Sequence, residues 1–149
     1  MTETSPNHGR PGLEHIGEPE SWDLLAGAQV CRLAFPLDGR TELVPANYVA
    51  IEQRLLFRTV PGSVIERAAG TPTVFEVDGW TEHDAWSVVV RGPLQRVEDG
   101  DRIRQADAVG LDPWPTREQP ASVLLEVVPL EVQGRRFGRR AQPGMLWSW

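Results

Sequence analysis

The sequence of 149 residues contains no lysine, so all 15 of its Lys/Arg positions are arginine. A Schiff base with pyridoxal phosphate and the phosphate contact of a P-loop both need the primary amine of a lysine. A guanidinium cannot replace that amine. Both kinds of chemistry are therefore excluded.

Cysteine and histidine are also scarce. Cys31 is the only cysteine, and the three histidines, His8, His15 and His83, are scattered singly. One cysteine can form neither an intrachain disulfide nor a Cys-rich metal cage, and the isolated histidines lack the spacing of a zinc site. We therefore expect no metal, and we interpret Cys31 as a small buried hydrophobe.

Long hydrophobic runs and excess positive charge are absent as well. No apolar run approaches the ~20 residues that a transmembrane helix needs, and the first residues lack the pattern of a signal peptide. The net charge of −6 disfavours nucleic acid as a partner. We expect a cytoplasmic protein that binds neither membrane nor nucleic acid.

The distribution of proline, glycine and apolar residues divides the chain into three parts. Residues 1–18 are rich in glycine and proline, with little to bury, and are interpreted as a flexible N-terminal arm. Residues 19–137 have the composition of one domain, and residues 138–149 form a C-terminal tail. The tail ends in the apolar segment 145–149, which we expect to cover a partner subunit, to shield a ligand cleft, or simply to adhere to exposed apolar surface.

Most of the domain alternates apolar and polar residues with a period of two, which indicates β-strands. Asp38-Gly39 is a strong hairpin signal, and Gly92-Pro93 predicts a bend at a barrel corner. The six predicted strands are Val30–Leu37, Thr41–Ile51, Arg54–Thr59, Thr73–Val77, Ala85–Val97 and Ser122–Val132.

Three short helices are predicted between these strands. They begin at Pro19, Ser63 and Asp99, and Ser63 and Glu66 have the spacing of a capping box. A mainly β protein with six antiparallel strands and small helices indicates a closed or split β-barrel. Strands of this length favour closure or dimerisation over open edges.

Five segments resemble a known family in their order and spacing. They cover residues 31–35, 44–49, 56–63, 75–78 and 86–92. In these segments the chain resembles the actinobacterial branch of the pyridoxamine 5′-phosphate oxidase-like, FMN-binding split barrels, over roughly residues 20–135. The resemblance implies a six-stranded split barrel that forms a homodimer, with flavin mononucleotide in a cleft between the two barrels.

The resemblance also implies which residues bind the cofactor. The phosphate is expected near Arg58, Thr59, Gly62 and Ser63, where a cation, two hydroxyls and the N–H groups of a helix N-terminus suit an anion. The positions that match the isoalloxazine contacts are Asn47, Trp86, Ser87 and Val88.

Each of these residues also has a simpler interpretation. Ser63 can serve only as a helix cap, and Arg58 only as one half of a surface ion pair. Trp86 can belong to the core or to a dimer interface, and Asn47 can bond to the backbone alone.

One position departs from the family pattern. Val64 stands where the family usually has lysine, and Arg67, three residues on, is a candidate replacement cation. The departure keeps open the deazaflavin F420 as cofactor, and haem is bound by other relatives. We expect a flavin-dependent oxidoreductase that acts on a small molecule the sequence does not identify. The alternative is a non-catalytic module that binds a cofactor or a partner protein.

Overall fold

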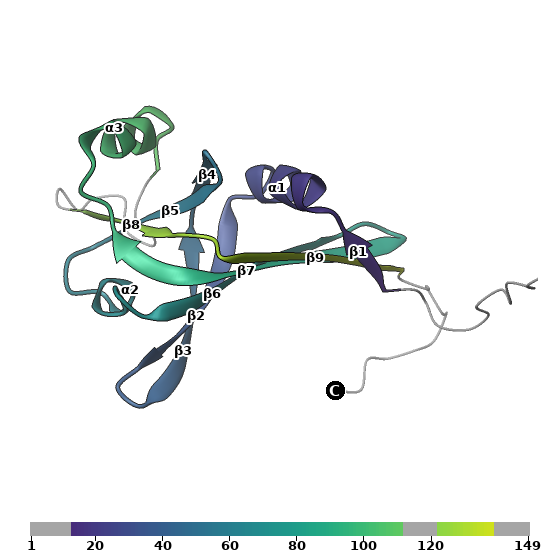
Figure 1. The fold of residues 1–149 in the computed structure, drawn as a ribbon, viewed down its shortest axis with the longest axis horizontal. Coiled ribbons are helices and arrows are strands. Elements are labelled where there is room, and N and C mark those ends of the chain that lie inside the picture. Colours follow the sequence, from purple (N-terminus) through teal and green to yellow (C-terminus); the bar gives the residue numbers. More distant parts are fainter. Residues whose placement is uncertain (1–12, 112–121, 139–149) are drawn as a thin grey trace, which may run out of the picture.

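The computed structural model describes residues 13–111 and 122–138. Over these residues the chain forms nine strands and three helices, arranged as a curled sheet with the helices around it (Figure 1). In chain order the elements are β1 (Glu14–Ile16), α1 (Glu18–Ala26), β2 (Val30–Leu37), β3 (Arg40–Asn47), β4 (Val49–Ile51), β5 (Arg54–Thr59), α2 (Val64–Arg67), β6 (Pro72–Trp80), β7 (Asp84–Arg96), α3 (Gly100–Ala108), β8 (Val123–Val127) and β9 (Glu131–Gly138).

All of the strand pairings are antiparallel. The main path of the sheet runs β3-β2-β6-β7-β8-β5-β4, and β9 pairs with β7 on one side and β1 on the other. The two ends of this path, β3 and β4, are separated in the chain by Tyr48 alone. The sheet therefore curls back on itself, and the predicted mainly β, antiparallel barrel is confirmed.

The strand pattern follows from alternating burial. In β2 the side chains of Cys31, Leu33 and Phe35 are buried, and the residues between them face outward. Asp38 and Gly39 have φ values of 52° and 77°, as a two-residue hairpin turn requires, and β2 pairs with β3 directly across this turn. The predicted hairpin is confirmed.

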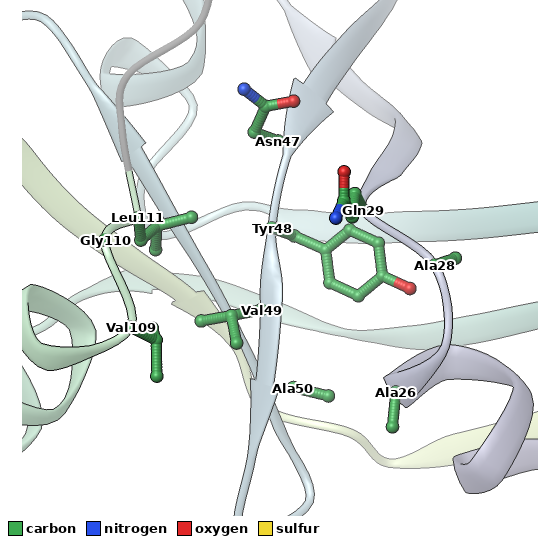
Figure 2. A pocket seen from close by; sticks show the side chains of 10 residues that line it. All are labelled: Ala26, Ala28, Gln29, Asn47, Tyr48, Val49, Ala50, Val109, Gly110 and Leu111. Carbon is green, nitrogen blue, oxygen red and sulfur yellow. The ribbon is translucent and has the colours of Figure 1, made fainter.

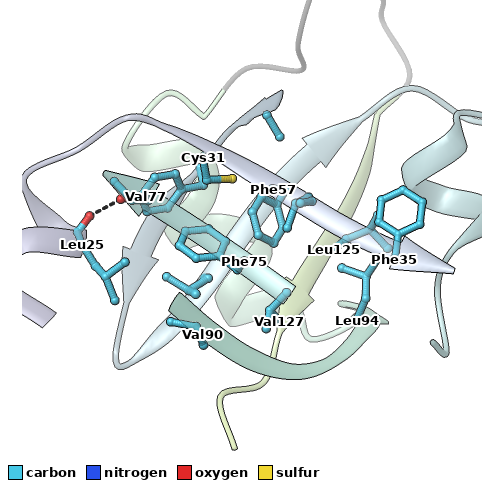
Figure 3. Packing of buried hydrophobic residues seen from close by; sticks show 14 of the residues in the cluster. Leu25, Cys31, Phe35, Phe57, Phe75, Val77, Val90, Leu94, Leu125 and Val127 are labelled. Atoms are coloured by element: carbon cyan, nitrogen blue, oxygen red, sulfur yellow. Dashed lines mark hydrogen bonds between the residues drawn. The ribbon is translucent and has the colours of Figure 1, made fainter. Parts of the chain in front are cut away.

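The hydrophobic core fills the inside of the curl (Figure 3). At its centre the ring of Phe75 meets Tyr48 edge to face, with 4.9 Å between the centroids, and Phe57 at 5.8 Å. A second, smaller cluster lies on the other side of β5, where α3 packs against it. Its buried members are Leu56, Val97, Ala106, Leu111 and Leu124.

Strand β7 changes partner at Gly92. From Asp84 to Arg91 it pairs with β9, whereas Leu94 to Arg96 pair with β8. A Cβ atom on Gly92 would lie 1.9 Å from the carbonyl oxygen of Val128, so only glycine allows this close approach of two backbones. This crossing is the corner that Gly92-Pro93 predicts.

Three predicted segments differ from the observed elements. The second strand was predicted as one piece, Thr41–Ile51, but it is divided at Tyr48 into β3 and β4. The last strand was predicted as one piece, Ser122–Val132, but it is divided into β8 and β9, and β9 continues to Gly138 at the start of the predicted tail. The predicted arm contains β1, which pairs with β9 so that Ile16 lies opposite Gly134. Burial of Ile16 gives this short strand a reason to order that composition alone does not reveal.

Helix α1 lies against the same strand. A Cβ atom on Gly134 would be 2.3 Å from the Ser21 hydroxyl, so the helix can pack this closely only because Gly134 has no side chain.

No helix among the described residues is long and apolar enough to span a membrane. Residues 1–12 of the predicted arm, residues 112–121 and the predicted tail from residue 139 onward lie outside the described residues.

Candidate functional site

Asn47 and Arg58 point outward from neighbouring strands. Val49 of β4 pairs with Leu56 of β5. Asn47 lies two residues before Val49 and Arg58 two residues after Leu56, so both lie toward the same end of these strands. The chain neighbours of Asn47 and the residue before Arg58 are buried in the main core. Alternation therefore places the Asn47 and Arg58 side chains on the outer face of the barrel wall.

A hollow of about 400 Å³ opens beside Asn47 (Figure 2). It lies between the end of α1, the joint of β3 and β4, and the loop that follows α3. Ten residues line it: Ala26, Ala28, Gln29, Asn47, Tyr48, Val49, Ala50, Val109, Gly110 and Leu111. The lining carries no charged side chain and two amide side chains, Gln29 and Asn47. It suits a neutral, planar group with hydrogen-bonding edges better than a phosphate.

A second, smaller hollow of about 220 Å³ adjoins Arg58. The Arg58 side chain is only 14% exposed; its Nη1 donates to Ser122 Oγ at 2.8 Å, and its other terminal nitrogen pairs with Asp107 of α3. Its Nε is buried and has no hydrogen-bond partner among the described residues. The lining residues are Arg58, Arg96, Val97, Glu98, Ile103, Ser122, Val123 and Leu124.

In the turn after β5, the polar groups form hydrogen bonds with one another. Thr59 Oγ1 lies 2.6 Å from Ser63 Oγ, which also accepts from Glu66 N at 3.2 Å. The Glu66 carboxylate accepts from Gly62 N at 3.3 Å. Ser63 is thus a helix cap, as the capping box predicted. The four-residue α2 does not present the free N–H groups at Gly62 and Glu66 that the anion-site prediction assumed.

The candidate replacement cation, Arg67, faces a different part of the molecule. Its Nη2 lies 2.6 Å from Asp38 Oδ2, in the turn between β2 and β3. Another arginine approaches the predicted phosphate turn instead, because Arg96 Nη2 lies 2.8 Å from Glu66 Oε1. Sequence reasoning missed Arg96, since nothing in the linear spacing of residues 62–66 and 96 indicates that they meet.

The remaining predicted residues lie on the other half of β7. Val88 is buried in the core, Trp86 packs against the core, and the Trp86 ring lies over Gly79, where a Cβ atom would be 2.6 Å from it. From Trp86 to Leu94, where β7 joins β8 on the way to Arg58, the strand runs about 26 Å. None of Trp86, Ser87 and Val88 lines the hollow at Asn47 or the hollow at Arg58 that are described above.

Ser87 faces the opposite side of β7 from Trp86. It pairs with Asp78 of β6 and Arg135 of β9, on the outer face of the sheet. On the same face Arg32 contacts Glu76 at 3.2 Å and Asp78 at 3.1 Å. Burial, followed by the neighbouring Asp78, raises the pKa of Glu76. This face is polar and charged along its middle.

Other catalytic chemistry finds little support in the described part of the chain. Cys31 is buried, and burial raises the pKa of its thiol, which disfavours the nucleophilic thiolate. Residues 13–111 and 122–138 contain no group of three or more His, Cys, Asp or Glu residues that could hold a metal ion.

Comparison with known proteins identifies the family. The family model described as pyridoxamine 5′-phosphate oxidase matches residues 17–136. The chain belongs to the pyridoxamine 5′-phosphate oxidase family. Its split-barrel fold is the one that the sequence resemblance implied.

Proteins similar to this pyridoxamine 5′-phosphate oxidase family member occur in Mycobacterium and Corynebacterium. An uncharacterized protein of Mycobacterium tuberculosis is 31% identical over 90 residues, which cover 60% of this chain and 80% of the relative. The structure of an FAD-binding protein from Mycobacterium smegmatis is 30% identical, with a TM-score of 0.72, and the match covers 83% of this chain and 99% of that one. A conserved protein of unknown function from Corynebacterium diphtheriae is also 30% identical, with a TM-score of 0.69, over 86% of this chain and 99% of that one.

Proposed function

We propose that this protein binds a flavin nucleotide and uses it to oxidise or reduce a small organic molecule. The observation that carries the proposal is the similarity to the FAD-binding protein of Mycobacterium smegmatis, which the chain matches over almost the whole length of that protein. A bound flavin supplies the electron transfer itself, and the chain supplies orientation, electrostatics and a shaped pocket. This division of labour accounts for a site that needs no nucleophile and no metal.

The two hollows on the outer face support the proposal. The neutral, amide-lined hollow at Asn47 fits the hydrogen-bonding edge of a flavin ring. The hollow at Arg58 is too small for a whole ligand, for which roughly 300–1,000 Å³ is usual, but suits a phosphate group. The Nε of Arg58, which has no hydrogen-bond partner within residues 13–111 and 122–138, is a donor that such a group could engage. In this proposal Thr59, Gly62 and Ser63 form the adjoining wall.

The proposal includes a homodimer, because Ser87 lies on the outer face of β7 outside both hollows and would border a ring at Asn47 from a second copy, with Trp86 and Val88 beneath it in the core. An apolar surface supports this arrangement. Trp80 is 70% exposed and Phe137 is 43% exposed, and both are in register with Ala85, so they lie on one face of the sheet. Exposed aromatic side chains that share a face are typical of an interaction surface.

The chemical form of the cofactor follows from the mass of the bound molecule. The sequence resemblance predicts FMN, and the Mycobacterium smegmatis relative favours FAD; both share the ring and the first phosphate, so either suits the two hollows. F420 is the alternative, because Val64 offers no cation where the family usually has one. Mass spectrometry of the small molecule that co-purifies with the protein separates the three.

Absorbance tests the function itself. Purified protein should be yellow, with a flavin band near ~450 nm, and NADH or NADPH should bleach that band if the flavin turns over. We propose the cytoplasm as the setting, where such reductants are available. Flavin that stays oxidised with every reductant and substrate offered would favour storage or sensing. A colourless protein that binds neither flavin nor F420 would favour the interaction module.

A further inference from the structure

We propose that Arg96 is the second cation of the phosphate seat, and that Glu66 holds this cation until the phosphate of the ligand displaces it. The inference rests on the proposed flavin function and adds a binding residue to it. The term phosphate seat denotes the hollow lined by Arg58, Arg96 and Ser122.

Arg96 reaches the phosphate seat from the last residue of β7, whereas Arg58 reaches it from β5. Strand β8 lies between these two strands in the sheet. Two guanidinium groups thus approach one small hollow from two directions. Guanidinium groups form strong, charge-assisted hydrogen bonds to phosphate oxygens, and two of them can replace the missing lysine at Val64.

Glu66 occupies the position expected of an anion. One oxygen of its carboxylate lies 2.8 Å from Arg96 Nη2, and the other accepts from Gly62 N at 3.3 Å. The side chain is only 15% exposed, whereas Arg96 is 52% exposed. A half-buried carboxylate between a guanidinium and a backbone N–H makes the contacts that two phosphate oxygens would make.

Arg58 has the same kind of internal partner, since Asp107 of α3 pairs with its guanidinium. Asp107 is 60% exposed, so water can take over its solvation when the pair opens. Each arginine of the phosphate seat is therefore paired with a carboxylate outside the lining of the hollow, whereas Glu98 belongs to the lining itself. A bound phosphate would draw the two guanidinium groups away from Glu66 and Asp107, because a guanidinium bonds more strongly to the group that carries more negative charge.

In this inference Arg67 takes no part in the phosphate seat. Its contact with Asp38 directs the side chain to the hairpin between β2 and β3. Arg67 is 51% exposed, close to the value for Arg96, so the two arginines form a matched pair for substitution.

The test compares FMN with riboflavin, which has the same ring and lacks the phosphate. Arg96→Met should weaken FMN binding by at least about tenfold and leave riboflavin binding within about twofold. Arg67→Met, the matched control, should change neither affinity. Glu66→Gln should strengthen FMN binding by about threefold or more, with riboflavin unchanged, because the competing charge is removed. Arg96→Lys, which restores a cation, should recover most of the FMN affinity.

Each possible result either supports or overturns the inference. Selective loss of FMN binding in Arg96→Met, with recovery in Arg96→Lys, supports it. Equal losses of FMN and riboflavin binding would show that Arg96 only maintains the fold, and a selective loss in Arg67→Met alone would assign the cation to Arg67. If the wild-type protein binds FMN and Arg96→Met binds it equally well, only this inference is overturned. If the wild-type protein binds neither compound, the proposed function is overturned together with it.

Discussion

The hydroxyl of Tyr48 donates a hydrogen bond to the backbone carbonyl of Leu25, in the last turn of α1. Tyr48 is the single residue between β3 and β4, and its ring packs edge-on against Phe75 in the core. The Tyr48 side chain thus connects α1 to the point where the sheet curls back on itself. The same residue lines the hollow at Asn47, so the fold and the candidate site share this anchor.

Replacing Tyr48 by phenylalanine keeps the ring and removes the hydroxyl. The carbonyl of Leu25 then keeps only backbone donors in the end of the helix, such as Ala28 N at 3.5 Å, so we expect the free energy of unfolding to fall by about 1–3 kcal/mol. Urea denaturation measures this change. A Tyr48→Phe variant as stable as the parent would show that the hydrogen bond contributes nothing net.

Gly92→Ala should be one of the most destabilising single-methyl additions in the chain. The added Cβ atom would lie 1.9 Å from the Val128 carbonyl oxygen, so the crossing of the two strands must open. We expect a loss of about 3 kcal/mol or more, at the upper end of overpacking effects. Gly138→Ala is the control, because a Cβ atom there meets nothing within 4 Å. Equal thermal midpoints for the two variants would contradict the prediction.

Glu126 is a buried carboxylate shared by three donors. Arg54 at 3.0 Å, Arg102 at 2.5 Å and Gln95 at 2.8 Å all bond to it, and together they link α3 to β5, β7 and β8. Glu126→Gln leaves two arginines without their counter-charge, so we expect a loss of about 3–5 kcal/mol. The exposed pair of Arg104 and Asp101 gives the comparison: Asp101→Asn should cost less than about 1 kcal/mol. Denaturation curves that shift equally for both substitutions would argue against a special role for Glu126.

Trp80 provides a test of the proposed homodimer. A Trp80→Glu substitution places a charge on the exposed apolar face, so it should shift the protein from the mass of two chains to that of one in light scattering. Leu43 on β3 is 66% exposed and lies on the same face, but its register partners, Ala34 and Val74, meet β6 six residues away from Trp80, so Leu43→Glu should leave the mass unchanged. A wild-type protein that is already monomeric in dilute solution would refute the dimer directly.

Cys31 predicts a loss of stability at alkaline pH. Burial raises the pKa of its thiol in the folded protein above the unfolded value of about 8.5. The unfolded chain therefore loses its proton first, and stability is unaffected below about pH 8.5 but falls as the pH rises further. Between pH 7.5 and 9.5 the wild-type protein should lose about 1 kcal/mol more than Cys31→Ala does. Parallel slopes for the two proteins would mean that the thiol ionises equally well when folded.

Local patterns in the sequence predicted much of the barrel. The alternation in β2 and the turn at Asp38-Gly39 are local properties, whereas glycine is needed at position 92 because Val128 of a distant segment crosses there. The break between β8 and β9 is not local. It arises because Val128 N and Leu130 N bond to the carbonyls of Pro93 and Arg91, on the strand that crosses there. Likewise, β1 exists only because β9 is placed beside it.

The candidate site was predictable to a similar degree. Asn47 and Arg58 could be placed on one outer face by counting along two adjacent strands. The partners of the two arginines could not be predicted in this way. Arg58 contacts Asp107, 49 positions away, and Arg96 contacts Glu66, 30 positions away. Such contacts depend on the curl of the whole sheet, which no short pattern encodes.

Strand β7 would contribute residues to both pockets of the proposed dimer. The strand has thirteen residues, Asp84–Arg96. Measured along the backbone, about 33 Å separate Trp86 from Arg96. In the proposed dimer, the Trp86 end of the strand would border the flavin ring of one pocket, and Arg96 would approach the phosphate of the second pocket. One continuous stretch of backbone, bent at Gly92, would therefore contribute to both pockets.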